Sequence, residues 1–99
     1  MINLDDALKI LRQHEADLRA RGIRRAAIFG SVSRGQARPE SDLDVMIEID
    51  KAAKLTVFDY VAIKRAVAEL FPGPVDVVNG AALKRAVGRS GRRDIVYAF

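Results

Sequence analysis

The sequence predicts a small two-layer domain of the α/β (α+β) class. Two segments have the apolar spacing of amphipathic helices, one near the N-terminus and one after Thr56. Short runs rich in β-branched residues predict strands at 24–29, 43–49 and 75–78. The chain has 99 residues, is 49% hydrophobic and contains no linker or low-complexity stretch, so we expect residues 1–99 to form one compact domain.

The first predicted helix spans residue 4 to about residue 21. Asn3 is a suitable N-cap and Gly22 a suitable stop signal. One apolar stripe contains Leu4, Leu8, Leu11 and Leu18. His14, the only histidine, lies off this stripe, so we expect a surface residue and not a ligand or a base.

The second predicted helix begins after Thr56. Thr56 and Asp59 have the spacing of a capping box, and Leu55 and Tyr60 that of a hydrophobic staple. Its apolar stripe contains Tyr60, Ile63, Val67 and Leu70, and Pro72-Gly73-Pro74 ends it. We expect this helix to be a scaffold.

The C-terminal segment allows more than one interpretation. Residues 81–87 have the pattern of a short helix, and 94–99 that of a helix end or an edge strand. A basic cluster falls between them, which could contact triphosphate, an acidic protein surface or RNA, although a solvated basic face is the commoner explanation. Its members are Lys84, Arg85, Arg89, Arg92 and Arg93. No aromatic residues are interleaved with them, so direct nucleic-acid binding is not expected.

Asp42 and Asp44 form an Asp-x-Asp pair at the start of the second predicted strand. The period of two puts both side chains on one face, with Cα atoms roughly 7 Å apart. At a charge separation of about 5 Å and an effective dielectric near 20, their repulsion costs on the order of 3 kcal/mol. A partly buried pair would therefore hold a proton or bind a cation such as Mg²⁺. The alternative is a turn residue followed by a solvated strand residue.

A glycine-serine turn precedes this pair. Gly30 allows the backbone to turn directly after the first predicted strand, and Ser31 begins a short segment that ends at Gly35. Exposed amides at a helix start attract anions, and Arg34 adds a cationic fork that suits phosphate. The motif predicts a phosphate site, with an ordinary strand-turn-helix as the alternative.

Asp76 interrupts the third predicted strand. If that strand is buried, an unpaired carboxylate in it needs a cation or a hydrogen-bond donor. If it lies beside the strand of Asp42 and Asp44, the three carboxylates converge on a site that could hold two Mg²⁺ ions.

Composition excludes several classes of protein. The sequence contains no cysteine, which rules out disulfides, zinc-thiolate sites and cysteine nucleophiles. The N-terminus does not resemble a signal peptide, and no apolar run approaches membrane-spanning length. We expect a cytoplasmic protein.

Together the motifs resemble a known family. They are Phe29-Gly30-Ser31-Val32-Ser33-Arg34-Gly35, Ser41-Asp42-Leu43-Asp44-Val45 and Val75-Asp76-Val77-Val78. They are similar to the minimal nucleotidyltransferase (MNT) branch of the DNA polymerase β-like superfamily. The resemblance implies a mixed sheet with helices packed on one face. It also implies that Gly30 and Ser31 grip the nucleotide, that Asp42 and Asp44 bind both metals, and that Asp76 binds the catalytic metal and helps to deprotonate the acceptor hydroxyl.

The resemblance further implies a function. Family members of this size resemble antitoxins paired with HEPN-domain ribonuclease toxins, in which AMP from ATP is placed on a toxin tyrosine. We therefore expect a Mg²⁺-dependent nucleotidyltransferase that forms a hetero-oligomer with such a toxin. Two alternatives stay open: a non-catalytic antitoxin that neutralises the toxin by stoichiometric binding, and a nucleotidyltransferase acting on a small molecule.

Overall fold

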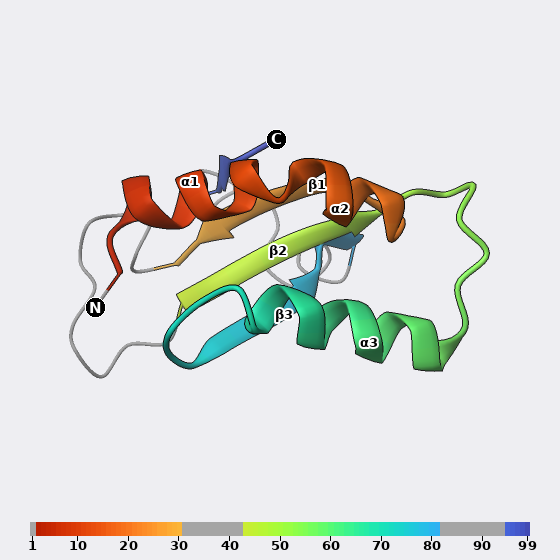
Figure 1. The fold of residues 1–99 in the computed structure, drawn as a ribbon. Coiled ribbons are helices and arrows are strands. Elements are labelled where there is room, and N and C mark those ends of the chain that lie inside the picture. Colours follow the sequence, from red (N-terminus) through yellow and green to blue (C-terminus); the bar gives the residue numbers. More distant parts are fainter. Residues whose placement is uncertain (1, 31–42, 82–94) are drawn as a thin grey trace.

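Four strands form one mixed sheet in a computed structural model that describes residues 2–30, 43–81 and 95–99. The strands are β1 (Ile23–Phe29), β2 (Leu43–Ile49), β3 (Val75–Asn79) and β4 (Val96–Tyr97), in the order β3-β2-β1-β4 (Figure 1). β1 runs antiparallel to β2 and to β4, whereas β2 and β3 are parallel. The expected mixed sheet is confirmed.

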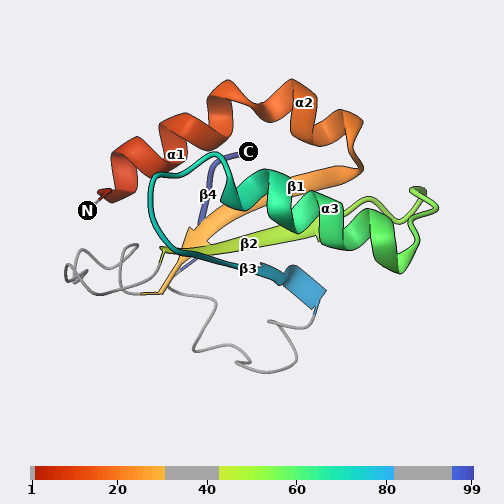
Figure 2. The ribbon, with the colours of Figure 1, turned by 60° about the horizontal axis from the view of Figure 1, so that its bottom comes forward.

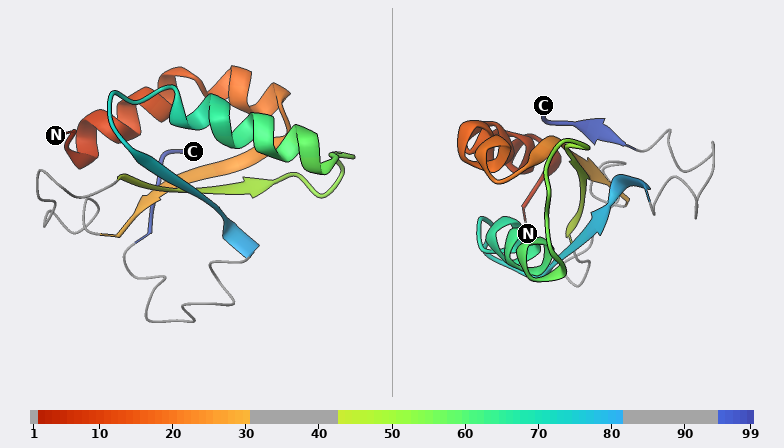
Figure 3. Two further views of the ribbon diagram at one scale, coloured as in Figure 1. Left: turned by 90° about the horizontal axis from the view of Figure 1, so that it is seen from below. Right: turned by 90° about the vertical axis from the view of Figure 1, so that its right-hand side faces the viewer.

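The helices α1 (Leu4–Gln13), α2 (Glu15–Ala20) and α3 (Val57–Ala68) cover one face of this sheet, as Figures 2 and 3 show from two further directions. No element in the described ranges covers the other face, which we call the open face. The expectation of helices packed on a single face is confirmed.

Strand alternation separates the core from the open face. Leu43, Val45 and Ile47 of β2 belong to the core cluster, together with Leu8, Leu11 and Leu18 of the helices. The intervening β2 residues therefore project to the open face, and they are Asp44, Met46 and Glu48. The predicted stripes of the helices are confirmed as core, including Ile63 and Val67 of α3.

The predicted helix over 4–21 is two helices, because the chain breaks at His14. This residue has φ −106° and ψ 12°, and its Nδ1 lies 2.9 Å from the carbonyl oxygen of Ile10. A side chain that bonds the carbonyl four residues earlier competes with the helix ladder. His14 is half-buried, so it still lies partly at the surface, and the expectation that it is neither a ligand nor a base stays a prediction.

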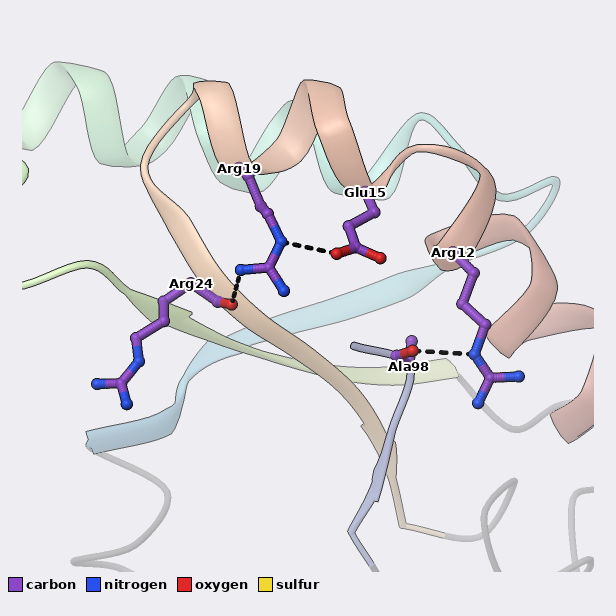
Figure 4. Close-up of polar contacts among 5 residues, drawn as sticks. All are labelled: Arg12, Glu15, Arg19, Arg24 and Ala98. Atoms are coloured by element: carbon purple, nitrogen blue, oxygen red, sulfur yellow. Dashed lines mark hydrogen bonds and ion pairs between the residues drawn. The ribbon is translucent and has the colours of Figure 1, made fainter.

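Two arginines tie the helical layer to the sheet (Figure 4). Arg12 Nε donates to the carbonyl of Ala98 at 2.9 Å, next to β4. Arg19 donates to Glu15 through Nε at 2.8 Å and to the carbonyl of Arg24 through Nη1 at 2.9 Å. These contacts hold α1 and α2 over β1 and β4.

The C-terminus forms an edge strand, so of the two interpretations the helix end was wrong. Tyr97 pairs with Ala27 and Val96 with Ile28 of β1. After β3, residues 80–81 begin a helical turn, in which Asn79 Oδ1 accepts from the amide of Ala81 at 2.9 Å. The rest of the predicted helix 81–87, and the basic cluster at 84–93, lie outside the described residues. No helix in the described ranges is long and apolar enough to cross a membrane.

The capping box of α3 is confirmed. Asp59 N donates to Thr56 Oγ1 at 3.1 Å, and Thr56 N donates to Asp59 Oδ2 at 3.0 Å. Thr56→Ala should lower the free energy of unfolding by about 1 kcal/mol. For a chain of this size that is a fall in Tm of about 4–8 °C in a thermal melt. Thr56→Ser keeps the hydroxyl and should melt like wild type; an unchanged Tm in Thr56→Ala would contradict a stabilising cap.

Candidate functional site

The open face brings two of the predicted site residues side by side. Asp44 of β2 and Asp76 of β3 are direct partners in the parallel register. Neighbouring strands lie about 4.8 Å apart, and paired residues project to the same face. Asp44 and Asp76, which are 32 positions apart in the sequence, thus become neighbours, as expected if the third predicted strand lies beside the second.

Exposure differs between the two aspartates. Asp44 is half-buried, whereas Asp76 is exposed near the start of β3. We expected Asp76 to need a partner because its strand would be buried. This expectation was wrong, because one face of β3 is uncovered by any described element and Asp76 is exposed on it. Its placement beside Asp44 comes from strand pairing and not from burial.

Gly30 lies against Asp44 at the end of β1. Phe29, the residue before it, is the register partner of Asp44. Gly30 has φ +78°, a left-handed conformation that favours glycine, and a Cβ added there would collide with Asp44 Oδ2. Both properties explain why this position is glycine: the chain turns sharply while its backbone passes close to the carboxylate.

Gly30, Asp44 and Asp76 therefore gather at one end of the open face. Mg²⁺ ordinarily takes one or two carboxylates from a protein, with substrate phosphates and water as its other ligands. The oxygen-only donor set fits that ion. In the described ranges no group of three or more acidic or histidine side chains gathers. Ser31, Arg34 and Asp42, the other predicted site residues, lie outside the described residues, so their roles stay predictions.

The nucleotidyltransferase domain family matches residues 6–98. The chain belongs to this family. The match spans all the described strands and all the helices except the first two residues of α1, so it includes Gly30, Asp44 and Asp76. The prediction of a nucleotidyltransferase enzyme is confirmed.

A curated relative is similar over nearly its whole length. The present chain, a nucleotidyltransferase, is 31% identical over 98 residues to protein adenylyltransferase MntA of Thermococcus cleftensis. The alignment covers 98% of this chain and 97% of the relative. The relative is named as a protein adenylyltransferase, an enzyme that transfers AMP to protein.

Solved structures share the fold. One described as a candidate minimal nucleotidyltransferase is 30% identical, with a TM-score of 0.70, covering 96% of this chain and 95% of its own. Another contains a tri-AMPylated HEPN toxin of Shewanella oneidensis in complex with an MNT antitoxin; it is 15% identical, with a TM-score of 0.59, over 93% of this chain and 71% of that one. The first supports the MNT assignment, and the second supports the fold.

Sequence reasoning missed a group of basic residues at the far end of the open face of the nucleotidyltransferase. Arg24 and Arg25 of β1 and Lys51 after β2 line one pocket there with Tyr97 of β4. The only local signal was the Arg-Arg pair inside a strand, which strand alternation would place on opposite faces.

Proposed function

We propose that this chain is a protein adenylyltransferase that moves AMP from ATP to a hydroxyl group of a partner protein. The observation that carries the proposal is the pairing of Asp44 with Asp76 beside the Gly30 turn, on a face that no described element covers. The name of the relative from Thermococcus cleftensis supports a protein as the acceptor.

The proposed transfer is an in-line displacement at the α-phosphorus of ATP. A bond forms between the acceptor oxygen and this phosphorus, and the bond from phosphorus to the oxygen that bridges to the β-phosphate breaks. Pyrophosphate leaves with that oxygen, and the acceptor proton passes towards Asp76. Gly30 lets the Asp44 carboxylate lie directly against the backbone, next to which the phosphates would bind.

Divalent metal completes the proposed site. Mg²⁺ held by Asp44, Asp76 and the predicted ligand Asp42 would neutralise charge on the phosphates and lower the pKa of the acceptor hydroxyl. Asp76 is the more exposed of the two described carboxylates, which suits a group that meets an incoming acceptor.

The proposed acceptor is a tyrosine of a HEPN-type ribonuclease toxin, which the transfer would silence. A structural neighbour is an MNT antitoxin bound to an AMPylated HEPN toxin, and it shares the fold of this chain. On this proposal the chain is an antitoxin that forms a hetero-oligomer with its toxin.

Neutralisation by binding alone is the second candidate function. The observation that favours it is an apolar patch on α3, where Phe58 is 86% exposed, Val57 77% and Val61 50%. Large exposed apolar side chains gathered on one helix are typical of protein contact surfaces. A docking surface serves both functions, so catalysis has to be measured directly.

Nucleotide binding should depend on the carboxylates and on metal. Asp44→Asn removes one charge from the proposed metal site and should weaken Mg-ATP binding at least about tenfold, since contacts to charged groups contribute about 1.5–3 kcal/mol. Titration calorimetry with Mg²⁺, and again with EDTA, measures both effects. The metal site would be contradicted if ATP bound equally well with Mg²⁺ and with EDTA, and if Asp44→Asn left the affinity unchanged.

A further inference from the structure

A pocket lies on the open face, at the end of the sheet away from the two aspartates. Its volume is about 510 Å³, and Arg24, Arg25, Lys51, Glu48 and Tyr97 are among its lining residues. This size is within the range of about 300–1,000 Å³ that ligand sites occupy. Glu48 is four residues from Asp44 along β2 and on the same face, so the pocket lies about 13 Å from the proposed catalytic end.

A β-bulge gives this pocket its charge. Ile23 pairs with Ile49 and Arg25 with Glu48, so one extra residue of β1, Arg24, is inserted between the two pairs. A bulge breaks the alternation of a strand and redirects a side chain. Arg24 and Arg25 are both exposed and both line the pocket, and Figure 4 shows the Arg24 side chain pointing away from α2.

The cations of the pocket are available to a ligand. Among the described residues, ion pairs join Arg19 to Glu15 and Arg21 to Asp17, on α2 and its C-terminal cap. None of the three lining cations takes part in them. The Arg25 guanidinium lies 5.5 Å from the centre of the Tyr97 ring, which holds this side chain over the pocket. The described lining residues carry three cations and one carboxylate, so this part of the pocket favours an anion.

We propose that the pocket binds an acidic side chain of the acceptor polypeptide, about four residues from the hydroxyl that receives AMP. The inference rests on the proposed function, because it takes the acceptor to be a protein. An extended polypeptide advances about 3.3 Å per residue, so four residues span the same distance of about 13 Å that separates the pocket from Asp44. The anchored carboxylate would hold the acceptor hydroxyl at Asp76.

The lining favours a single carboxylate over a polyphosphate or a nucleic acid. The arginine forks match a carboxylate in a bidentate arrangement. With Glu48 in the same lining, the formal charge of the described lining residues is only +2, from three cations and one carboxylate, which suits a single carboxylate better than a polyphosphate. Arg25 already covers one face of the Tyr97 ring, the one aromatic ring among the described lining residues on which a base could stack.

The test compares labelled nine-residue peptides that contain one tyrosine and differ at one position. A glutamate stands four residues before or after the tyrosine, and the matched peptides carry glutamine instead. In fluorescence anisotropy, the wild-type chain should bind a glutamate peptide about tenfold more tightly than its glutamine counterpart, the effect expected of one charged contact. Arg24→Glu with Lys51→Glu should abolish this preference, since neither side chain has a contact among the described residues whose loss would unfold the sheet.

A matched variant controls for net charge. Lys9→Glu with Arg65→Glu makes the same change of charge on exposed positions of α1 and α3 and should keep the preference. Equal binding of both peptides by the wild type would overturn the proposal. The proposal would also be overturned, in favour of a nucleic-acid site, if neither peptide bound and a labelled single-stranded oligonucleotide bound in a way that depends on Arg24 and Lys51.

Mg-ATP affinity of the same variants separates this inference from the proposed function. The Arg24→Glu, Lys51→Glu variant should bind Mg-ATP like wild type, because both positions lie at or beyond Glu48, which is about 13 Å from Asp44 along β2. If the wild-type chain transfers no AMP to the HEPN-type partner, the proposed function is contradicted. Transfer without any peptide preference would contradict the pocket assignment alone.

Discussion

Replacing Asp76 with asparagine should lower the rate of AMP transfer about a thousandfold or more, because a positioned charge at the reacting atoms contributes several kcal/mol to the barrier. Asp76 is exposed, so the substitution should leave the domain folded and still able to dock on its partner. The measurement is intact mass spectrometry of the HEPN-type partner after incubation with Mg-ATP and either protein. Wild type should add one or more AMP units, and Asp76→Asn none in the same time.

Glu69→Gln provides the control, since it removes an exposed carboxylate at the C-cap of α3, away from the open face. It should transfer AMP like wild type. The ribonuclease activity of the partner is then assayed after this chain has been removed. If Asp76→Asn neutralises the partner equally well and no mass is added by either protein, the chain is a stoichiometric binder and the proposed enzyme function is wrong.

Gly30→Ala should weaken Mg-ATP binding about ten- to a hundredfold while the domain stays folded. The new Cβ would overlap Asp44 Oδ2, so the carboxylate has to move away from the proposed metal position. Losing one contact to a charged group costs about 1.5–3 kcal/mol, which corresponds to that loss of affinity. The left-handed φ adds strain of about 1–2 kcal/mol to the folded state. Calorimetry measures the affinity, and circular dichroism measures the fold.

Gly73→Ala is the matched control for this substitution. A Cβ at Gly73 has no heavy atom within 4 Å, and its φ is not left-handed. It should bind Mg-ATP like wild type. If Gly30→Ala also binds normally, Gly30 serves only the turn and takes no part in the nucleotide site.

Much of the fold could be predicted because its signals are local. The alternation of β2 put Asp44 opposite the apolar residues of that strand, and the structure confirms this arrangement. The Thr56 and Asp59 pair marked the start of α3 because a capping box is complete within four residues. The break at His14 was missed because the leucine stripe continues through it, and the hydrogen bond to Ile10 has no sequence signature.

The candidate site also has features that could be predicted from the sequence and features that could not. The types of residue and the turn at Gly30 could be predicted, because a left-handed backbone favours glycine. The sequence could not predict which strand lies beside β2 or in which register. Parallel pairing joins segments that are separated along the chain by a helix. The predicted burial of Asp76 failed for a related reason: its strand sequence does not say whether both faces of β3 are covered.

By itself, the sequence determined the chemistry available to this protein: a glycine turn, an Asp-x-Asp pair and a further aspartate, each set within a short segment. Tertiary structure alone decided that Asp44 and Asp76 are neighbours, that β4 closes the edge beside β1, and that a bulge turns Arg24 and Arg25 to one pocket. The physical reason is the distance along the chain over which each kind of interaction acts. Propensity and periodicity act over a few residues, whereas register and bulges follow from the free energy of packing the whole sheet against its helices.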